Sequence, residues 1–260
     1  MNDELNGKWI ESSIYMDSPH KFAFYNRNHT PEEYEDILNG KTIGQVTGHG
    51  SWILVSLEPG YMLKLGEGGE RILFHQSEDT LPEKHQLLLH FADESYLTVS
   101  VQGWGLVAIY QRPKDAPQSS GKISPLSDAF TFEHFQELFG ETTDRKSIKS
   151  FIISEPGISG VGNGYLQDIL FRARIHPTRK NADIAEAEKR ALYDAIRVTL
   201  KQAVELGGRD TERDLYNNPG GYPKILDRRK VDQPCPECGA PIKKIQYLGG
   251  SCYFCSSCQT

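Results

Sequence analysis

All five cysteines of this 260-residue chain lie beyond residue 234, and the spacing of four of them limits what that end of the chain can form. They form two Cys-x-x-Cys pairs, Cys235/Cys238 and Cys255/Cys258, with sixteen residues between the pairs. Each pair puts two thiolates on one tight turn, and two such pairs are typical of a tetrahedral zinc site. Disulfide bonds or chance spacing are the alternatives, but nothing else in the sequence indicates an oxidising compartment. We therefore expect these four cysteines to hold one structural Zn²⁺.

The residues between the two pairs predict a two-stranded ribbon. Segments 243–247 and 253–254 are rich in β-forming residues, and Gly249-Gly250 supplies a turn between them. Cys252 falls inside the second strand, so we interpret it as a ribbon residue and not as a metal ligand. A ribbon this small buries little apolar surface, so the metal must supply most of its folding free energy.

The composition is that of a soluble globular protein, with 38% hydrophobic and 25% charged residues. No apolar run approaches the roughly 20 residues of a membrane helix, and the polar start Met1–Leu5 is unlike a secretory signal. We therefore expect a cytoplasmic protein with no membrane partner. The net charge of -6 argues against a nucleic-acid partner unless cations gather on one face.

The first 111 residues predict short strands separated by turns, which is typical of an antiparallel sandwich or barrel. One helix interrupts them at 31–38, with Thr30 as its N-cap and Pro31 in its first position. The expected strands cover residues 10–15, 21–25, 42–47, 52–57, 61–65, 71–74, 86–91, 96–101 and 106–110.

After a polar linker at 112–122, the pattern changes to helices. The expected helices cover 132–139 with Thr131 as cap, 146–153, 163–173, and 184–206 with Asp183 as cap. An irregular connector over 209–234 leads to the ribbon. The predicted fold class is α+β, with a β-sandwich domain at 1–118, a helical domain at 122–232 and a zinc ribbon at 233–260.

A glycine-rich turn, Gly160–Tyr165, precedes the expected helix at 163–173. Free N–H groups at a helix N-terminus attract anions, and the amide of Asn163 beside Gly162 can donate to a phosphate oxygen. The alternative is a plain connection between two helices.

Basic residues gather near this turn in the sequence. A basic face on an acidic protein is one interpretation of them, and a mixed solvated surface is the other. These cations are Arg172, Arg174, His176, Arg179, Lys180, Lys224, Arg228, Arg229 and Lys230.

Several motifs together resemble the formamidopyrimidine-DNA glycosylase and endonuclease VIII family of base-excision repair enzymes, over nearly the whole chain. The matching motifs are Gly160-Val161-Gly162-Asn163, Phe171-Arg172-Ala173, Ile175-His176-Pro177, Gly207-Gly208-Arg209-Asp210-Thr211, Gly220-Gly221-Tyr222, Pro82-Glu83-Lys84-His85, Pro125-Leu126-Ser127-Asp128 and the cysteine ribbon ending in Cys258-Gln259. The resemblance implies a β-sandwich and a helix-two-turn-helix domain with a zinc ribbon, acting as a monomer on double-stranded DNA that carries a damaged base or abasic site. It also implies base flipping, attack by an N-terminal proline amine, proton transfer by the next glutamate, and strand cleavage.

The start of the chain departs from the family pattern. Residues 4–10 echo residues 37–43, and the second copy follows a helix. Only six residues precede Gly7, too few for a stable helix. By the resemblance Gly7-Lys8-Trp9-Ile10 already corresponds to the first strand, so the catalytic proline and glutamate have no counterpart and no catalytic residue is assigned. Either Met1 is an internal methionine of a longer enzyme, or the protein lacks the nucleophile.

Other family positions also differ. The resemblance aligns a strand lysine with Ser51, the ribbon arginine with Gly250, and two arginines with Gln102 and Gly103. Trp104 takes the place of a wedge phenylalanine; it is either a wedge or an ordinary core residue. The DNA contacts that remain by resemblance are His85, Lys149 and Asn163.

The leading expectation is a damaged-DNA-binding protein of the DNA glycosylase and abasic-site lyase family, inactive or impaired in covalent chemistry as written. The alternatives are a non-catalytic module for lesions or DNA ends, and a zinc-stabilised protein-interaction domain. The lesion-reading loop is expected in the connector 209–232.

Overall fold

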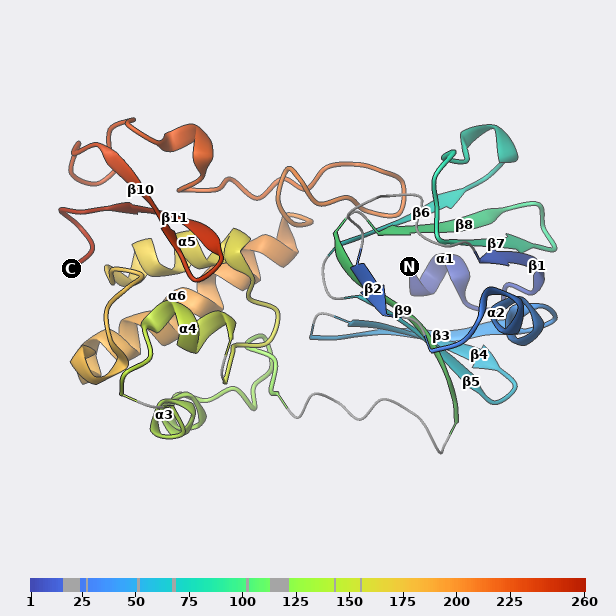
Figure 1. The fold of residues 1–260 in the computed structure, drawn as a ribbon, viewed down its shortest axis with the longest axis horizontal. Helices are drawn as coiled ribbons and strands as arrows, with labels where there is room; N and C mark the ends of the chain where they lie inside the picture. The colour runs from blue at the N-terminus through green and yellow to red at the C-terminus, as the bar shows by residue number, and fades with distance from the viewer. Residues whose placement is uncertain are drawn as a thin grey trace. The chain divides into compact units, whose positions relative to one another are not determined.

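The computed structural model describes residues 1–15, 24–26, 28–50, 52–66, 69–101, 103–112, 122–142, 144–154 and 156–260. The chain forms two compact units, one of residues 1–121 and 213–219 and the other of residues 122–212 and 220–260. Strands dominate the first unit and helices the second (Figure 1). Part of the expected strand at 21–25, most of the linker, and the positions of Ser51 and Gln102 lie outside the described residues.

The first unit is a sandwich of two sheets, as predicted. One sheet has the order β1-β7-β8-β6 and the other β2-β9-β5-β4-β3. Every pairing is antiparallel except that of β2 with β9, which is parallel. The strands are β1 (Ile10–Tyr15), β2 (Phe24–Asn26), β3 (Thr42–His49), β4 (Trp52–Glu58), β5 (Tyr61–Gly66), β6 (Glu70–His75), β7 (Leu87–Phe91), β8 (Tyr96–Val101) and β9 (Trp104–Gln111), with a short 3₁₀ helix at Glu78–Thr80.

Alternating side chains build the core of this unit. Leu87, Leu89 and Phe91 of β7 are buried, whereas the residues between them are half-buried. Leu63 and Leu65 of β5 contribute from the other sheet to the same apolar cluster. Every second residue of these strands is apolar in the sequence and buried in the structure, which is why the strands could be predicted.

Helix α2 (Pro31–Leu38) begins as the sequence indicates. The Thr30 hydroxyl accepts a hydrogen bond from the Glu33 amide at 3.3 Å, and the Glu33 carboxylate accepts one from the Thr30 amide at 2.8 Å. This reciprocal capping satisfies two donors at the helix start. Tyr34 and Leu38 are buried and attach the helix to the sandwich.

A single helical turn, α1 (Asn2–Leu5), forms where we expected no stable helix. Tertiary contacts stabilise it, since isolated short helices are unstable in water. Leu5 is completely buried, and the side-chain oxygen of Asn2 accepts a hydrogen bond from the Val46 amide at 2.9 Å. The expectation was wrong because it considered helix length alone.

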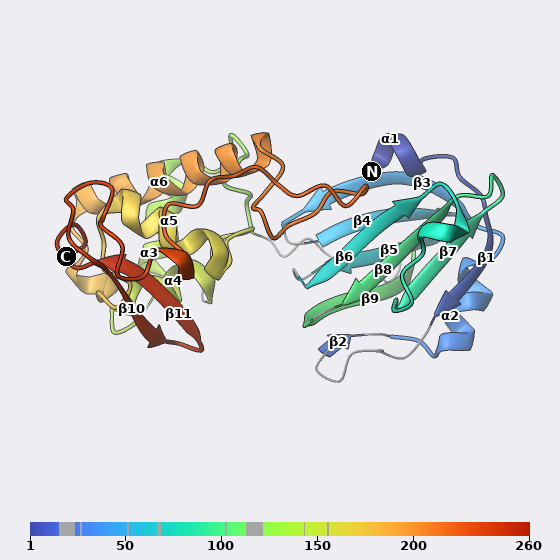
Figure 2. The same cartoon turned by 90° about the horizontal axis from the view of Figure 1, so that it is seen from above.

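Residues 213–219 leave the helical half of the sequence and pack on the sandwich (Figure 2). Leu215 packs against the sandwich core, and its carbonyl accepts a hydrogen bond from the Phe74 amide at 2.8 Å. The Tyr216 ring meets the Phe74 ring edge-on with centroids 6.4 Å apart, and its hydroxyl donates to the Glu4 carboxylate. The sandwich core is thus completed by residues far along the chain.

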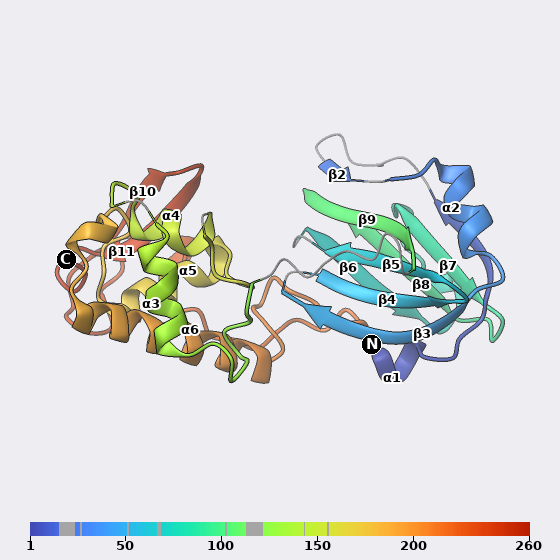
Figure 3. The same ribbon diagram turned by 90° about the horizontal axis from the view of Figure 1, so that it is seen from below.

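The second unit combines four α-helices with the two-stranded ribbon among its described residues (Figure 3). The elements are α3 (Phe132–Gly140), α4 (Ile148–Ile153), α5 (Asn163–Ala173), α6 (Glu186–Glu205), β10 (Ile242–Tyr247) and β11 (Gly250–Cys255), with 3₁₀ helices at Asn181–Asp183 and Arg228–Lys230. Phe135, Phe151, Leu192 and Ile196 lie in its main core. None of the helices in the described part of the chain is long and apolar enough to cross a membrane.

The start of α6 differs from the prediction. Ala185, and not Asp183, is the N-cap residue. Asp183 instead ends the preceding 3₁₀ turn, and the Glu188 carboxylate accepts a hydrogen bond from the Ala185 amide at 2.9 Å. A carboxylate inside the first turn therefore satisfies the amide of the N-cap residue, and the N-cap residue itself supplies no side-chain hydrogen bond to the helix.

Candidate functional site

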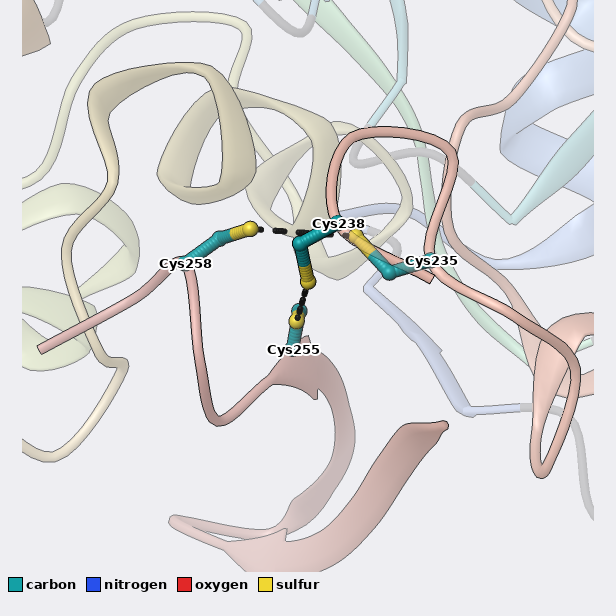
Figure 4. Close-up of side chains that lie close together, drawn as sticks. All are labelled: Cys235, Cys238, Cys255 and Cys258. Carbon is teal, nitrogen blue, oxygen red and sulfur yellow. Dashed lines mark hydrogen bonds between the residues drawn. The ribbon is translucent and has the colours of Figure 1, made fainter. Parts of the chain in front are cut away.

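The four predicted ligand cysteines converge at one point (Figure 4). Their sulfur atoms all lie within 4.8 Å of one another, with 3.8 Å between Cys235 and Cys258 and 3.5 Å between Cys238 and Cys255. Cys235 and Cys238 come from the turn before β10, and Cys255 and Cys258 from the end of β11 and the turn after it. Four thiolates arranged in this way can hold a metal ion.

Two local turns present these sulfurs. In the first, the Cys235 amide donates to the Ala240 carbonyl at 2.8 Å, and Gly239 has a φ of 76°. In the second, the Cys255 amide donates to the Gln259 side chain at 2.9 Å, and the Gln259 amide donates back to the Cys255 carbonyl at 3.0 Å. Both pairs are therefore fixed by backbone hydrogen bonds and not by the sulfurs alone.

The environment of the sulfurs suits a metal centre. Cys235 and Cys255 are buried, while Cys238 is exposed. Hydrogen bonding to the Cys238 thiol, together with burial and the other two thiols, raises the pKa of Cys258 to about 12. Metal binding therefore has to displace protons from the thiols. Cys252 pairs with Ile245 across the ribbon and is not one of the converging group, which confirms its interpretation as a ribbon residue.

The glycine-rich turn lies at the N-terminus of α5. Gly162 is the N-cap and Asn163 the first helical residue, and both are exposed. A Cβ atom built on Gly250 at the ribbon tip would lie 3.1 Å from the Asn163 side-chain nitrogen. The turn and the ribbon tip, which are distant in sequence, are therefore adjacent.

Side chains beneath the ribbon attach its tip to the helices. The Gln167 amide nitrogen donates to the Ser251 carbonyl at 3.0 Å, and its oxygen accepts from the Tyr253 amide at 3.0 Å. Lys149 is completely buried; its ammonium donates to the Tyr247 carbonyl at 2.5 Å and lies 3.5 Å from the Cys252 sulfur. The structure thus places Lys149 under the ribbon, and its predicted contact with DNA stays a prediction.

Sequence reasoning missed a buried carboxylate, Asp168. It is completely buried in α5 and accepts hydrogen bonds from the Tyr222 hydroxyl at 3.0 Å, the Ile225 amide at 3.0 Å and the Leu226 amide at 2.8 Å. Burial raises its pKa, and these hydrogen bonds oppose the rise. Asp168 therefore ties the connector to the helix that carries Asn163.

A second unpredicted group lies where α6 passes into the connector. The Arg209 side chain donates twice to one Glu212 oxygen, at 3.0 and 2.7 Å, and the Tyr165 hydroxyl donates to the other at 2.5 Å. Burial opposes ionisation of Glu212, but hydrogen bonds from Arg209 and Tyr165 leave its pKa below the usual value. The i, i+3 spacing of Arg209 and Glu212 was the available sequence signal.

The cations before the ribbon are partly neutralised. Arg229 contacts the carboxylates of Asp227 at 2.5 Å and Asp210 at 2.9 Å, and Lys224 contacts the Asp210 carboxylate at 2.8 Å. Arg228 is exposed. Asp210, Lys224 and Arg229 are among the residues that line a cavity of about 800 Å³. The pairing favours a mixed surface over a uniformly basic one at this point.

Two predicted site residues belong to the sandwich. His85 is half-buried, and its Nδ1 lies 3.1 Å from the Pro82 carbonyl. Trp104 begins β9 and pairs with Phe24. Its side chain lies outside what the structure describes, so both interpretations of Trp104 stay predictions.

Comparison with known proteins assigns the family. Residues 122–214 match the model of the formamidopyrimidine-DNA glycosylase H2TH domain. The formamidopyrimidine-DNA glycosylase of Roseiflexus sp. is 32% identical over 237 residues, which cover 88% of this chain and 86% of the relative. That of Bacillus licheniformis is 29% identical over 241 residues, covering 90% and 86%.

The fold agrees with this assignment. A solved complex of the Lactococcus lactis enzyme with DNA containing an abasic site has a TM-score of 0.83 and 23% identity, covering 99% of this chain and 94% of that one. This likeness confirms the predicted α+β class with a strand-rich first half and a helical second half that carries the four-cysteine ribbon. Since the sequence matches also extend over most of both chains, this chain belongs to the formamidopyrimidine-DNA glycosylase family.

Proposed function

We propose that this protein binds double-stranded DNA at damaged bases or abasic sites, as a DNA-repair protein of the glycosylase and abasic-site lyase type. Family membership supports the substrate class, because relatives of this name are matched over most of their length. The observation that carries the proposal is the exposed Asn163 at the N-terminus of α5, lying against the ribbon tip. N–H donors at a helix start favour a phosphate group.

We also propose that the cysteine cluster holds one structural zinc ion. Four thiolates on two tight turns match the donor set and geometry that zinc prefers. The small apolar cluster under the ribbon contains Phe171, Leu226 and Ile242 besides two of the cysteines. So few apolar side chains make the metal the main source of ribbon stability, and the ribbon in turn fixes the surface beside Asn163.

Substitution of Asn163 tests the DNA-binding proposal. Asn163→Ala removes a donor to phosphate and should weaken binding to an abasic-site duplex by roughly 1–3 kcal/mol. Asn163→Asp keeps the side-chain size and suits a helix start, but its charge repels phosphate, so it should lose more affinity. Gel-shift titration at several salt concentrations measures both effects.

The outcomes separate the candidate functions. A wild-type chain that shifts no duplex even at low salt would favour a protein-interaction domain, to which the acidic net charge of -6 is better suited. Binding that both Asn163 variants leave unchanged would place the DNA contact elsewhere on the chain. Exposed Asn6 offers a matched control, since Asn6→Ala alters the same residue type in the other unit.

A further inference from the structure

The ribbon turns through an unusual residue. Tyr247 pairs with Gly250, so Leu248 and Gly249 are the two residues of a tight hairpin turn. Their φ angles are 46° and 72°, as a type I′ turn requires. Such turns favour Asn-Gly, because asparagine tolerates positive φ and leucine does not. Leu248 therefore occupies a position where another residue would make a more stable ribbon.

Leu248 gains no compensating burial within the protein. Its side chain is 52% exposed, and it belongs to none of the apolar clusters among the described residues. The positive φ of this leucine costs stability, and its exposed side chain contributes little apolar burial to offset that cost. Strain of this kind is retained at functional positions, and apolar side chains at a tip are used to pack into the minor groove of DNA.

The tip is also held rigidly. Lys149 donates to the carbonyl of Tyr247, directly before the turn, and Gln167 hydrogen-bonds the backbone of Ser251 and Tyr253 after it. Burying an ammonium group is unfavourable unless hydrogen-bond acceptors surround it. Lys149 therefore favours the ribbon position in which the Tyr247 carbonyl accepts its hydrogen bond. A rigid tip loses little conformational entropy when it binds.

The surroundings of the tip favour DNA over a protein partner. Asn163 lies against Gly250, two residues from Leu248. A phosphate donor beside one exposed apolar side chain matches the alternation of phosphate and deoxyribose along a strand. At Gly250 itself no side chain is present to add a charge.

We propose that Leu248 is the apolar DNA contact of the ribbon, packing against the deoxyribose edge of the strand whose phosphate Asn163 binds. This assignment rests on the proposed DNA-binding function. Lys149 and Gln167 are positioning residues for it. Because packing against sugar releases no counterions, the contribution of Leu248 to affinity is independent of salt.

The test compares Leu248→Asn with the wild-type chain by fluorescence anisotropy, using a labelled duplex that contains a tetrahydrofuran abasic-site analogue. Asparagine suits the turn, so the variant should unfold at an equal or higher denaturant concentration than the wild type. Its affinity should fall about tenfold at every salt concentration, as expected for the loss of partial leucine burial. The slope of log affinity against log salt should not change.

A matched variant completes the experiment. Leu126 is similarly exposed, at 44%, and lies outside the ribbon, so Leu126→Asn should leave DNA affinity unchanged.

Each possible result of these measurements supports or overturns the role assigned to Leu248. Wild-type affinity in Leu248→Asn, or a changed salt slope in that variant, overturns it. If Asn163→Ala loses affinity and Leu248→Asn does not, only the role of Leu248 fails and the proposed function stands. A wild-type chain that binds no duplex overturns both.

Discussion

Asp168 is the residue on which the order of the connector depends. It is completely buried, and its two oxygens accept one hydroxyl and two backbone amide hydrogen bonds. The donors come from residues 54 to 58 positions away. No local pattern in the sequence links these positions, which is why Asp168 could not be predicted whereas the regularly spaced cysteines could.

Asp168→Ala should destabilise the second unit by about 3–5 kcal/mol, because three buried donors lose their acceptor. Asp168→Asn keeps one acceptor oxygen and should cost less. Denaturant unfolding measures the loss, and hydrogen exchange at the Ile225 and Leu226 amides locates it. Asp194, exposed and paired with Arg190 on α6, supplies a control whose alanine variant should change stability by less than about 1 kcal/mol. Equal effects at both positions would contradict the anchoring role.

Ionisation of Tyr222 makes the free energy of unfolding depend on pH in the alkaline range. Burial, and then the neighbouring Asp168 carboxylate, raise the pKa of its hydroxyl to about 12 from the ordinary value of 10.0. Below pH 10 the hydroxyl is neutral in both states and its contribution is complete. Between about pH 10 and 12 only the unfolded chain ionises, so the free energy of unfolding falls as pH rises, by about 2 kcal/mol from this group.

Tyr222→Phe should therefore flatten the decline in unfolding free energy between pH 10 and 12. Some decline should remain, because burial and Glu212 also raise the pKa of Tyr165. Urea unfolding at a series of pH values measures the slope for the variant and the wild type. Identical slopes would mean that Tyr222 is not the titrating group.

The ribbon is the element that sequence reasoning described most completely. Two cysteine pairs and the residues between them were enough to predict a two-stranded ribbon and the exclusion of Cys252 from the ligand set, because both depend on short-range spacing. The turn was predicted one residue too late: it lies at Leu248-Gly249, and Gly250 already begins β11, which is longer than the predicted strand at 253–254. What lies beneath it could not be predicted. The contacts of Lys149 and Gln167 join residues 98 and 84 positions apart.

The helix ends illustrate the same limit. Thr30 and Thr131 cap their helices as their positions indicate. At α6 the sequence offers three carboxylates, Asp183, Glu186 and Glu188, and only in the fold is it decided that Glu188 accepts from the amide before the helix. Local rules find candidate caps but do not rank them when a 3₁₀ turn precedes the helix.

Removal of the metal should unfold the ribbon and leave the sandwich intact. Elemental analysis of the purified protein should find one zinc per chain, and a strong chelator should abolish hydrogen-exchange protection of the β10 and β11 amides. Cys255→Ser should lose the zinc. Cys252→Ser, three residues away in the same strand, should keep it. A full equivalent of zinc in Cys255→Ser would exclude this cysteine as a ligand.

At the scale of the whole molecule, the question is which reaction the 260 residues can support. The family resemblance implies attack by an N-terminal proline amine, and residues 2 to 4 of this sequence are Asn2, Asp3 and Glu4. We therefore expect borohydride trapping with an abasic-site duplex to give no covalent adduct from a polypeptide of residues 1–260, even where the same duplex is bound.

An adduct would identify a different amine, and Lys8 is the first candidate to replace. In the structure its ammonium contacts the Asp93 carboxylate and, at 3.0 Å, the Ser95 hydroxyl. These contacts tie the Lys8 nitrogen to neighbouring side chains, so they would have to break before this amine could attack a sugar carbon. Lys8→Arg keeps the charge and the hydrogen bonds but cannot form a Schiff base, so persistence of the adduct in this variant would point to the α-amine.

Residues 213–219 belong to the strand-rich unit, and this limits how the polypeptide can be divided into fragments that fold on their own. Because the backbone enters the strand-rich unit a second time, it crosses between the units three times. A protease cut in the linker at 113–121 would leave two fragments, and the shorter would lack Leu215, which packs against its apolar core, and Tyr216, whose ring contacts Phe74. Recovering a stable sandwich by itself would require those seven residues to be grafted back, for instance as a tethered peptide.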